Sequence, residues 1–448
     1  GRLEEASKYY TKVTRIDPDF DHAIWFLLAN LAFERENYRK AKGIYEIYLE
    51  KAALAPIQVK AVRRAMNTCI FRAKALENPH QINPKRFKGG INTGADEYVN
   101  SISTDGNELI FTRKEPDPNL KDRYRERVFI SQKNDSIWSE ALEMDKFLNN
   151  FGNIGAVSFS PDGQYLFLTG CNAPGGFGSC DLYYTRKIGD QWDLPRNLGP
   201  IINTGSWESQ PCLSSDGKTL YFASHRPGGK GSSDIWRSVR LPDGTWSRPV
   251  NLGGLINTSK AEMAPFIHQD GKTLYYSSKG HTGMGGFDLF ISRMDKSGIW
   301  TAPQNLGYPI NTEADEINLI VGAEGKAGYT SIGSDLEDGK YDIYEIRIPE
   351  EFRPLPVTFL KGIVFDAKNK KPLEASFDLI DLNTGKSIVR SLSNPVNGQF
   401  LVCLPSNMEY ALNVSRPGYL FYSDHFELKG NKNVSDPYEK DVPLMPIE

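Results

Sequence analysis

Short runs of alternating apolar and polar residues fill the middle of the chain. Over residues 209–256 these runs read SQPCLSS, TLYFAS, DIWRSVR and PVNLGGLI. Alternation, β-branched and aromatic residues, and flanking turn residues are typical of strands. An Asp-Gly pair separates the first two runs and predicts a hairpin, because glycine readily adopts the positive φ of such a turn. The stretch therefore predicts four antiparallel strands.

The same pattern recurs with a period of 54 residues. The tryptophans of the repeat stand at Trp138, Trp192, Trp246 and Trp300. The Asp/Glu-Gly turns begin at Asp105, Asp162, Asp216, Asp270 and Glu324, with a first step of 57 residues. Asparagines keep the same steps at Asn92, Asn149, Asn203, Asn257 and Asn311. Repeated four-stranded units of this length predict the blades of a β-propeller, since a β-solenoid would need shorter coils.

The five turns predict five blades, and the pattern also indicates how the ring closes. The last unit has three strand-like runs, EINLIVG, GKAGYTSI and YDIYEIRI, and lacks an outer one. The segment RFKGGIN, at residues 86–92, precedes the first blade and has the outer-strand pattern. We therefore expect a five-bladed β-propeller over residues 84-350, closed by residues 84-92 pairing with the last blade. A ring closed in this way has no free sheet edge.

Before the propeller, apolar residues follow a helical spacing. Ala6 and Tyr10 correspond to Ala41 and Tyr45 at a step of 35 residues, and a further helix is expected at about 56–76. Small residues where helices touch, with aromatic residues in the gaps, are typical of tetratricopeptide repeats; a plain helical bundle is the alternative. We expect α-helices over residues 1-80, N-terminally incomplete because the first residues already read as the middle of a helix.

After EEFRPLPV the rhythm changes again. Residues 356-446 read as six or seven strands with turn signals every 8–12 residues. This spacing predicts a β-sandwich. The chain is therefore expected to be multidomain, with helices, a propeller and a sandwich in that order.

Composition and charge exclude some classes of protein. The chain has 448 residues, of which 39% are hydrophobic and 24% charged, with a net charge of −3. Lys and Arg exceed Asp and Glu over residues 1–90, but they are spread along the helices, so we expect a solvated surface and no nucleic-acid partner. No apolar run approaches the roughly 18 residues of a transmembrane helix.

The cysteines bear on the compartment. There are five, and none forms a CxxC pair, which argues against a zinc ribbon. Cys171 and Cys180 flank the segment NAPGGFGS and could face each other across a hairpin as a disulfide, which would imply an oxidising compartment. The other three cysteines lie in apolar patterns and are expected to be buried thiols.

The sharpest candidate for a binding site lies eight residues before each Asp/Glu-Gly turn. This position starts each innermost strand and holds Glu97, Ile154, Glu208, Glu262 and Glu316. The four glutamates are expected to ring one mouth of the channel, where they would attract a basic peptide or a cation. The alternative is that each glutamate satisfies backbone donors of its own blade.

The other repeated residues are expected to build the blades. The Gly-rich segments lack the spacing of a phosphate-binding loop and are interpreted as hairpins. The aspartates that open the third strands, Asp181, Asp234, Asp288 and Asp342, are expected to bind backbone amides of their own turns. No GxSxG or HExxH motif occurs, and no nucleophile, base and orienting group come together. The prediction is a protein that is not an enzyme, with no catalytic residue, cofactor or metal.

Three resemblances refine these expectations. The helices resemble tetratricopeptide repeats, and SSDGKTLYFASHRPGGKGSSDIW and SPDGQYLFLTGCNAPGGFGSCDLYY resemble TolB-like propeller repeats. KGIVFDA, KPLEASFDLID, NGQFLVCLP and RPGYLF resemble the carboxypeptidase regulatory-like domain, a prealbumin-like sandwich. This order of domains resembles periplasmic multidomain proteins of the OmpA family in Bacteroidota, among them PorE-like components of type IX secretion.

The resemblance implies a non-catalytic scaffold of the periplasm, associated with the outer membrane or cell wall. It would bind protein partners of the cell envelope or secretion machinery, and an OmpA-like domain expected after residue 448 would anchor it to peptidoglycan. The alternative is that the channel mouth binds a small ligand, sugar, cation or basic peptide.

Overall fold

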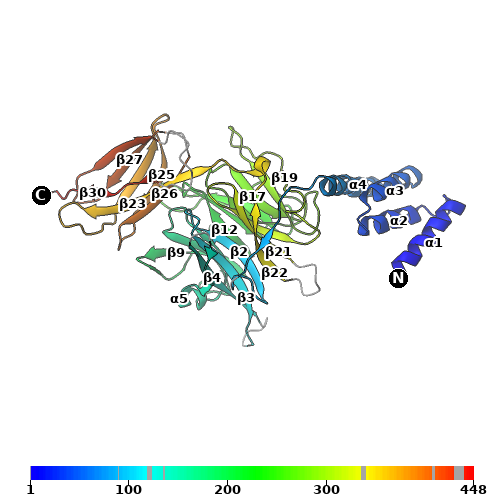
Figure 1. Ribbon diagram of the computed structural model, residues 1–448, viewed down its shortest axis with the longest axis horizontal. Helices are drawn as coiled ribbons and strands as arrows, with labels where there is room; N and C mark the ends of the chain where they lie inside the picture. Colours follow the sequence, from blue (N-terminus) through cyan, green and yellow to red (C-terminus); the bar gives the residue numbers. More distant parts are fainter. Residues whose placement is uncertain are drawn as a thin grey trace.

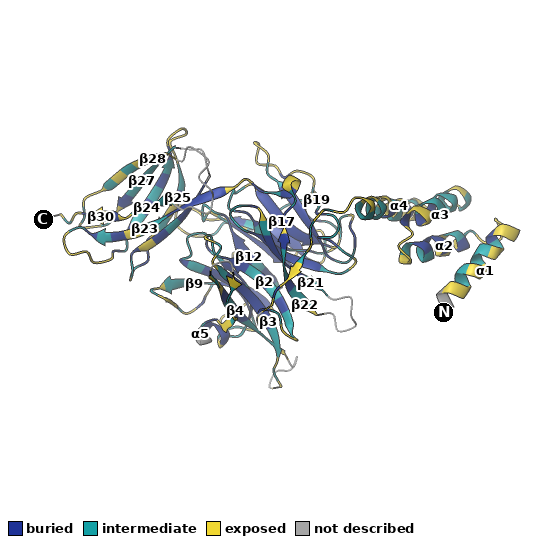
Figure 2. Ribbon diagram, in the orientation of Figure 1, coloured by how far each residue is buried: buried dark blue, intermediate teal, exposed yellow. Residues whose placement is uncertain are grey.

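A computed structural model describes residues 2–88, 90–118, 124–134, 137–333, 340–405, 409–427 and 438–447. Helices lie at one end of the molecule, a ring of β-sheets in the middle and a β-sandwich at the other end, so the two termini are far apart (Figure 1). The middle strands of the ring are the most buried part of the chain, whereas much of α1 is exposed (Figure 2).

The helical segment contains four helices. They are α1 (Arg2–Ile16), α2 (Ala23–Glu34), α3 (Tyr38–Lys51) and α4 (Pro56–Glu77). The side chain of Asn37 accepts a hydrogen bond from the backbone N of Lys40 and caps α3, and Pro56 stands in the first turn of α4. The helices α2, α3 and α4 share one small core, in which Ala29, Ala41 and Cys69 are fully buried.

The helical segment is not a tetratricopeptide repeat, and this part of the predicted fold class is wrong. Ala41 and Tyr45 are 0% and 3% exposed. Ala6 and Tyr10, which would be their counterparts 35 residues earlier, are only half-buried. The step of 35 residues thus relates positions with different surroundings. Small and aromatic residues recur here because any packed antiparallel helices need them at their contacts.

Five antiparallel sheets form the propeller blades. Their innermost strands are β2 (Asp96–Ile102), β7 (Asn153–Phe159), β12 (Glu208–Leu213), β16 (Glu262–Ile267) and β20 (Glu316–Val321). The second strands are β3 (Glu108–Pro116), β8 (Tyr165–Cys171), β13 (Thr219–Ser224), β17 (Thr273–Ser278) and β21 (Ala327–Gly333). The third strands are β4 (Tyr124–Asn134), β9 (Cys180–Ile188), β14 (Asp234–Val239), β18 (Asp288–Arg293) and β22 (Tyr341–Arg347).

The outer strands are short and differ among the blades. The first four blades have β5 (Ile137–Trp138) with β6 (Leu142–Glu143), β10 (Gln191–Trp192) with β11 (Arg196–Asn197), β15 (Val250–Asn251), and β19 (Gln304–Asn305). A single turn of helix, α5 (Lys146–Asn149), follows β6. The outer strand of the fifth blade is β1 (Lys85–Arg86), which pairs antiparallel with β22. The first and last parts of the ring are therefore joined in one sheet.

The residues that keep the period hold the blades together. The glycines of the five Asp/Glu-Gly turns have φ between 68° and 74°, a region that other residues rarely adopt. Asn203 accepts a hydrogen bond from the N–H of Leu182 and donates to its carbonyl, and Asn92 does the same with Ile343 across the closure. Backbone amides of the Gly-rich hairpins donate to Asp181, Asp234 and Asp288.

The C-terminal sandwich has two sheets. One contains β23 (Val357–Asp366), β26 (Gln399–Pro405), β29 (Tyr438–Glu439) and β30 (Val442–Leu444). The other contains β25 (Lys386–Leu392), β24 (Ser376–Asp381), β27 (Glu409–Ser415) and β28 (Tyr422–Glu427). A short 3-10 helix, Glu350–Phe352, precedes them. Their facing side chains, among them Phe377, Phe400 and Tyr410, form one core.

The helices and the sandwich contact opposite faces of the ring. Ser391 of the sandwich donates to Asp162, and Lys218 donates to the carbonyl of Ser387, so the sandwich lies on the face that carries the Asp-Gly turns. On the other face, Arg72 of α4 donates to the carbonyl of Gly283 over 3.1 Å, and Tyr38 of α3 donates to Glu313 over 2.9 Å. The innermost strands begin on this second face, which we call the mouth.

Candidate functional site

The four glutamates singled out in the sequence are buried at the starts of the innermost strands. Glu97, Glu208, Glu262 and Glu316 are each 0% exposed. Each accepts hydrogen bonds from the backbone N–H and the hydroxyl of a threonine four residues earlier, as Glu262 does from Thr258 over 2.7 Å and 2.7 Å. They thus brace the turn that leads into each strand. Their predicted role in binding a partner stays a prediction, and none has exposed surface in this structure.

Two of these glutamates also meet an arginine. Arg113 lies 2.9 Å from Glu97, and Arg226 lies 3.4 Å from Glu208. Burial raises the pKa of Glu97, and its threonine and arginine partners oppose that shift. Burial also raises the pKa of Glu316 well above its ordinary value. The arginine contacts therefore add to the glutamate brace in the first and third blades.

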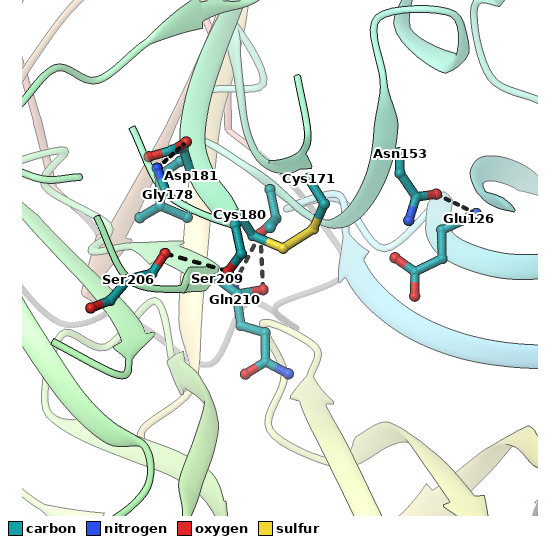
Figure 3. The surroundings of a disulfide bond; sticks show 12 residues. Glu126, Asn153, Cys171, Gly178, Cys180, Asp181, Ser206, Ser209 and Gln210 are labelled. Carbon is teal, nitrogen blue, oxygen red and sulfur yellow. Dashed lines mark hydrogen bonds between the residues drawn. A yellow bond between two sulfur atoms is a disulfide. The ribbon is translucent and has the colours of Figure 1, made fainter. Parts of the chain in front are cut away.

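The second blade has no such glutamate, because Ile154 takes its place, and it contains a disulfide instead. Cys171 ends β8, Cys180 begins β9, and the two are cross-strand partners joined through their sulfur atoms (Figure 3). An isolated parallel β-bridge between the backbones of Cys180 and Trp207 links the start of β9 to the third blade. Beside it, the rings of Trp207 and His225 lie 4.5 Å apart.

The positions next to the glutamates differ from blade to blade. Immediately before the repeated position, the five blades carry Asp96, Asn153, Trp207, Ala261 and Asp315. Immediately after it they carry Tyr98, Gly155, Ser209, Met263 and Ile317. Residues that recur from blade to blade stabilise the blades, whereas residues that differ make the mouth asymmetric. Charged groups gather where the fifth blade meets the first.

Three of these residues and three from neighbouring strands form one contiguous group, which we call the mouth cluster. Its members are Asp96, Tyr98, Lys114, Glu126, Asp315 and Tyr341. Tyr341 joins the two aspartates: its backbone N–H donates to Asp96 over 3.2 Å, and its hydroxyl donates to Asp315 over 3.1 Å. Its ring lies 5.1 Å from that of Tyr98. The two carboxylates are therefore separated by the length of a tyrosine side chain.

Asp96, Lys114 and Glu126 lie in one row across the first blade. Asp96 is the cross-strand partner of Lys114, and Lys114 is the partner of Glu126. The Lys114 ammonium is 3.8 Å from the Asp96 carboxylate. A second lysine, Lys279, is 3.5 Å from Asp315. The cluster thus contains three carboxyl groups with different neighbours.

Glu126 is half-buried and lies against Gly155 of the second blade. Burial raises its pKa, Asp96 adds to the shift, and Lys114 opposes it. A Cβ atom on Gly155 would lie 2.6 Å from Glu126 Oε2. The carboxyl group of Glu126 therefore occupies the space that a side chain at position 155 of the second blade would need. Figure 3 shows Glu126 beside Asn153 of the second blade, whose side-chain oxygen accepts from the backbone N–H of Glu126. The cluster therefore holds a carboxyl group inclined to keep its proton.

Below the mouth, a cavity of about 40 Å³ lies on the axis of the ring, lined by residues of all five innermost strands. Its wall includes the bulge residues Asn100, Ala156, Gln210, Ala264 and Asn318. The last four have φ between 46° and 59°. The Oδ1 atom of Asn318 is buried without a partner among the described residues. Because an ordered water needs about 10–15 Å³, the cavity has room for a few waters.

The mouth cluster was missed in the sequence, because the predicted binding site rested on residues that recur from blade to blade. The signal that could have found it is the opposite one, namely the positions where one blade departs from the others. Among the described residues, no group of three or more His, Cys, Asp or Glu side chains could hold a metal ion. In the same part of the chain, no helix is long and apolar enough to cross a membrane.

Comparisons with known proteins find likeness in structure only. No model of a protein family matches the chain, and no curated protein matches it. A solved structure described as a glycoside hydrolase has a TM-score of 0.42 at 11% identity, covering 64% of this chain and 96% of its own. The arabinanase of Bacillus subtilis has a TM-score of 0.37 at 12% identity, covering 57% and 96%. A glycosyl hydrolase from Bacteroides ovatus has a TM-score of 0.36 at 10% identity, covering 60% and 93%. At these identities no residue role carries over to this chain.

These comparisons correct the family and the function predicted from the sequence. The three structures named above are described as glycoside hydrolases or an arabinanase, and they do not support a tetratricopeptide, OmpA-family or PorE-like assignment. The prediction of a non-catalytic secretion scaffold anchored to peptidoglycan is therefore wrong, and so is the prediction that the protein is not an enzyme. The first rested on a resemblance in the order of domains, and the second on the absence of known catalytic motifs from the sequence. The predicted periplasmic location and envelope partners stay predictions.

Proposed function

We propose that the mouth cluster is the active site of an enzyme that hydrolyses a glycosidic bond. The observation that carries the proposal is the row Asp96–Lys114–Glu126, in which two carboxyl groups flank one lysine at the edge of the mouth. Hydrolysis of a glycosidic bond needs two carboxyl groups with opposite protonation states. Burial raises the pKa of Glu126, whereas Asp96 lies beside the Lys114 ammonium and accepts from the backbone N–H of Tyr341.

The spacing of the row suits this chemistry. Asp96 and Glu126 lie two strands apart, and neighbouring strands are about 4.8 Å apart. Their backbones are thus about 9.6 Å apart, a spacing that lets the carboxyl groups reach the roughly 6.5–9.5 Å of an inverting hydrolase. That wider spacing leaves room for a water molecule between the base and the sugar.

In this mechanism Glu126 is the general acid and Asp96 the general base. Glu126 donates its proton to the glycosidic oxygen while the bond from that oxygen to the anomeric carbon breaks. Asp96 takes a proton from a water molecule, whose oxygen forms the new bond to the anomeric carbon. The proton then returns from Asp96 to Glu126 through solvent. Each turnover consumes one water and leaves both carboxyl groups as they began.

The remaining mouth residues suit a carbohydrate. Tyr98 and Tyr341 offer aromatic faces on which the C–H face of a sugar ring can pack, and Trp207 offers another across the mouth. Asp315 and Asn153 add acceptors and donors for hydroxyl groups. Such a mixture of aromatic walls and a few polar groups is what a small polar ligand requires.

The test is hydrolysis by the purified protein of a panel of 4-nitrophenyl glycosides and plant and microbial polysaccharides, with release of reducing sugar as the readout. We expect Glu126→Gln and Asp96→Asn each to lower kcat about 10²–10⁴-fold, the usual contribution of a general acid or base. The matched control is Asp243→Asn, which removes an exposed carboxylate from a turn of the third blade. Wild-type protein that hydrolyses none of the panel, or variants that retain its rate, would overturn the proposal.

A further inference from the structure

A second concave site lies on the outer rim of the ring, on elements that take no part in the mouth cluster. It is a groove of about 330 Å³ between β15 of the third blade and the turn that precedes Trp300 in the fourth. We call it the rim groove. Its volume lies in the range of about 300–1,000 Å³ that small-molecule sites occupy.

The walls of the rim groove are apolar and exposed. Val250, Leu255 and Ile299 are 58%, 49% and 59% exposed, and all three line it. One period earlier, the counterparts of Val250 and Ile299 are Arg196 and Thr245, whereas that of Leu255 is the apolar Ile201. Val250 and Ile299 therefore set this pair of blades apart from the preceding pair. Apolar side chains gathered in a groove of this kind mark a binding surface.

The polar groups of the groove are donors. Arg237 lines it from β14, and none of the groove-lining residues is an aspartate or glutamate. Within the described ranges no carboxylate lies at ion-pair distance from Arg237, which interacts instead with the side chain of Tyr221. The counterparts of Arg237 in the neighbouring blades are Tyr183 and Ile291. The charge is thus particular to this groove.

A second unpaired donor lies in the same wall. Trp300 is 7% exposed, and its Nε1 atom is buried with no acceptor among the described residues. The Lys230 side chain passes over Gly254 at the end of the groove, with Nζ 3.3 Å from where a Cβ of Gly254 would stand. The groove thus combines two cations and an indole N–H with no matching acceptor. A buried donor without a partner costs free energy, which a bound acceptor would recover.

We propose that the rim groove binds a small organic carboxylate with an apolar body. The guanidinium of Arg237 takes the carboxylate, for which its planar fork of N–H donors is suited. Val250, Leu255 and Ile299 enclose the apolar body. Because the site shares no residue with the mouth cluster, it stands whether or not the protein hydrolyses glycosides.

The experiment is isothermal titration calorimetry of the purified full chain with phenylacetate as the probe. The neutral analogue 2-phenylethanol and inorganic sulfate are titrated in parallel. Arg237→Gln removes the guanidinium, and Arg248→Gln is the matched control, since it removes an exposed arginine of the same blade that does not line the groove. We expect wild type and Arg248→Gln to bind phenylacetate alike, and Arg237→Gln to bind it at least about tenfold more weakly.

Ile299→Ala provides a second variant, because an exposed side chain can be shortened with little risk to the fold. It should weaken phenylacetate and leave sulfate unchanged. The proposal is overturned if wild type gives no binding heat with phenylacetate, if 2-phenylethanol binds equally well, or if Arg237→Gln retains the wild-type Kd. Sulfate binding as tightly as phenylacetate would also overturn it, since the site would then recognise an anion without an apolar body.

Discussion

Burial has a larger effect on the pKa of Glu126 than the neighbouring charges have. Its neighbours pull in opposite directions, because Asp96 disfavours a second negative charge and the Lys114 ammonium favours one. Burial is the largest influence, and it raises the pKa of Glu126. The folded protein therefore holds the Glu126 proton more tightly than the unfolded chain does.

This difference predicts a dependence of stability on pH. Between the pKa of Glu126 in the unfolded chain and its higher pKa in the fold, the folded state binds more protons, so stability falls as pH rises through that window. Glu126→Gln cannot ionise, so we expect it to lose this fall and to be more stable than wild type at neutral pH. Urea unfolding at a series of pH values between about 4 and 7 measures it. A variant that keeps the wild-type slope would contradict the assignment.

The three thiols outside the disulfide are predicted to be unreactive in the folded protein. Burial raises the pKa of Cys69 to about 11, and that of Cys212 and of Cys403 to about 12. The thiolate, which is the reactive form, is then scarce at neutral pH. Titration with Ellman's reagent should find no fast-reacting thiol in the native protein, and the three of them after unfolding without reductant. A fast-reacting thiol in the native state would contradict it.

At the scale of the element, the repeated glutamates and the disulfide act on the same corner of the blade. In four blades a glutamate ties the start of the innermost strand to the preceding turn, as Glu262 does with Thr258. Glu262 also accepts from Ser278, at the end of the second strand of its blade. The blade with Ile154 in that position contains the disulfide instead. Both devices hold the mouth end of a blade, one by hydrogen bonds and the other by a covalent link.

Removing one glutamate brace should destabilise the ring. Glu262→Ala leaves the backbone N–H and hydroxyl of Thr258 and the hydroxyl of Ser278 without an acceptor in a buried place. We expect a loss of about 2–4 kcal/mol, since each unpaired buried donor costs roughly 1–3 kcal/mol and some will find water. The free energy of unfolding in urea measures it, with exposed Glu50→Ala as the control. A loss equal to that of the control would show that the brace carries no stability.

The disulfide should contribute a similar amount. It closes a short loop, with nine residues of sequence separation. The entropy of closing such a loop in the unfolded chain amounts to about 2–3 kcal/mol. The double variant Cys171→Ser, Cys180→Ser is therefore expected to unfold at lower urea by that amount while keeping its circular dichroism spectrum. An unchanged midpoint would mean that the native state gains nothing from the link.

Elements that depend on local pattern could be predicted from the sequence, and those that depend on the ring could not. The Asp-Gly turns, the strands beside them and the pairing of Arg86 with the last blade follow from residues that repeat. The bulge at Gln210 leaves no mark in the sequence, because its backbone N–H donates to Thr169 of the neighbouring blade, which is distant along the chain. Asp96 and Asp315 are distant along the chain. They lie on either side of Tyr341 only because the ring closes between the first and fifth blades.

At the scale of the whole molecule, the ring separates two sets of contacts. The sandwich contacts the face with the Asp-Gly turns, and the helices contact the mouth beside the fifth blade. Glu313, which accepts from Tyr38, stands two residues before Asp315 of the mouth cluster. The helical segment thus covers part of the approach to the candidate active site.

The closure of the ring can be tested with a matched pair of asparagines. Asn92 and Asn311 make equivalent hydrogen bonds to a third strand, but only Asn92 joins parts of the ring that are remote in sequence. We expect both alanine variants to lose about 1–3 kcal/mol of stability. Only Asn92→Ala should also speed hydrogen exchange along β1 and β22, which mass spectrometry can follow. Equal protection of these strands in both variants would contradict a special role for Asn92.

The direction of the strands at that closure has a mechanical consequence. The chain enters β1 from the helices and leaves β22 toward the sandwich, and Lys85 pairs with Glu345 near the exit of β22. Tension applied between the two ends of the molecule would, once the helices let go of the ring, pull both strands at the same end of their pairing. The few bonds there would break one after another, as in a zipper, and would not resist together as in shear. The seam that gives the propeller a continuous ring at rest is therefore where it opens first under load.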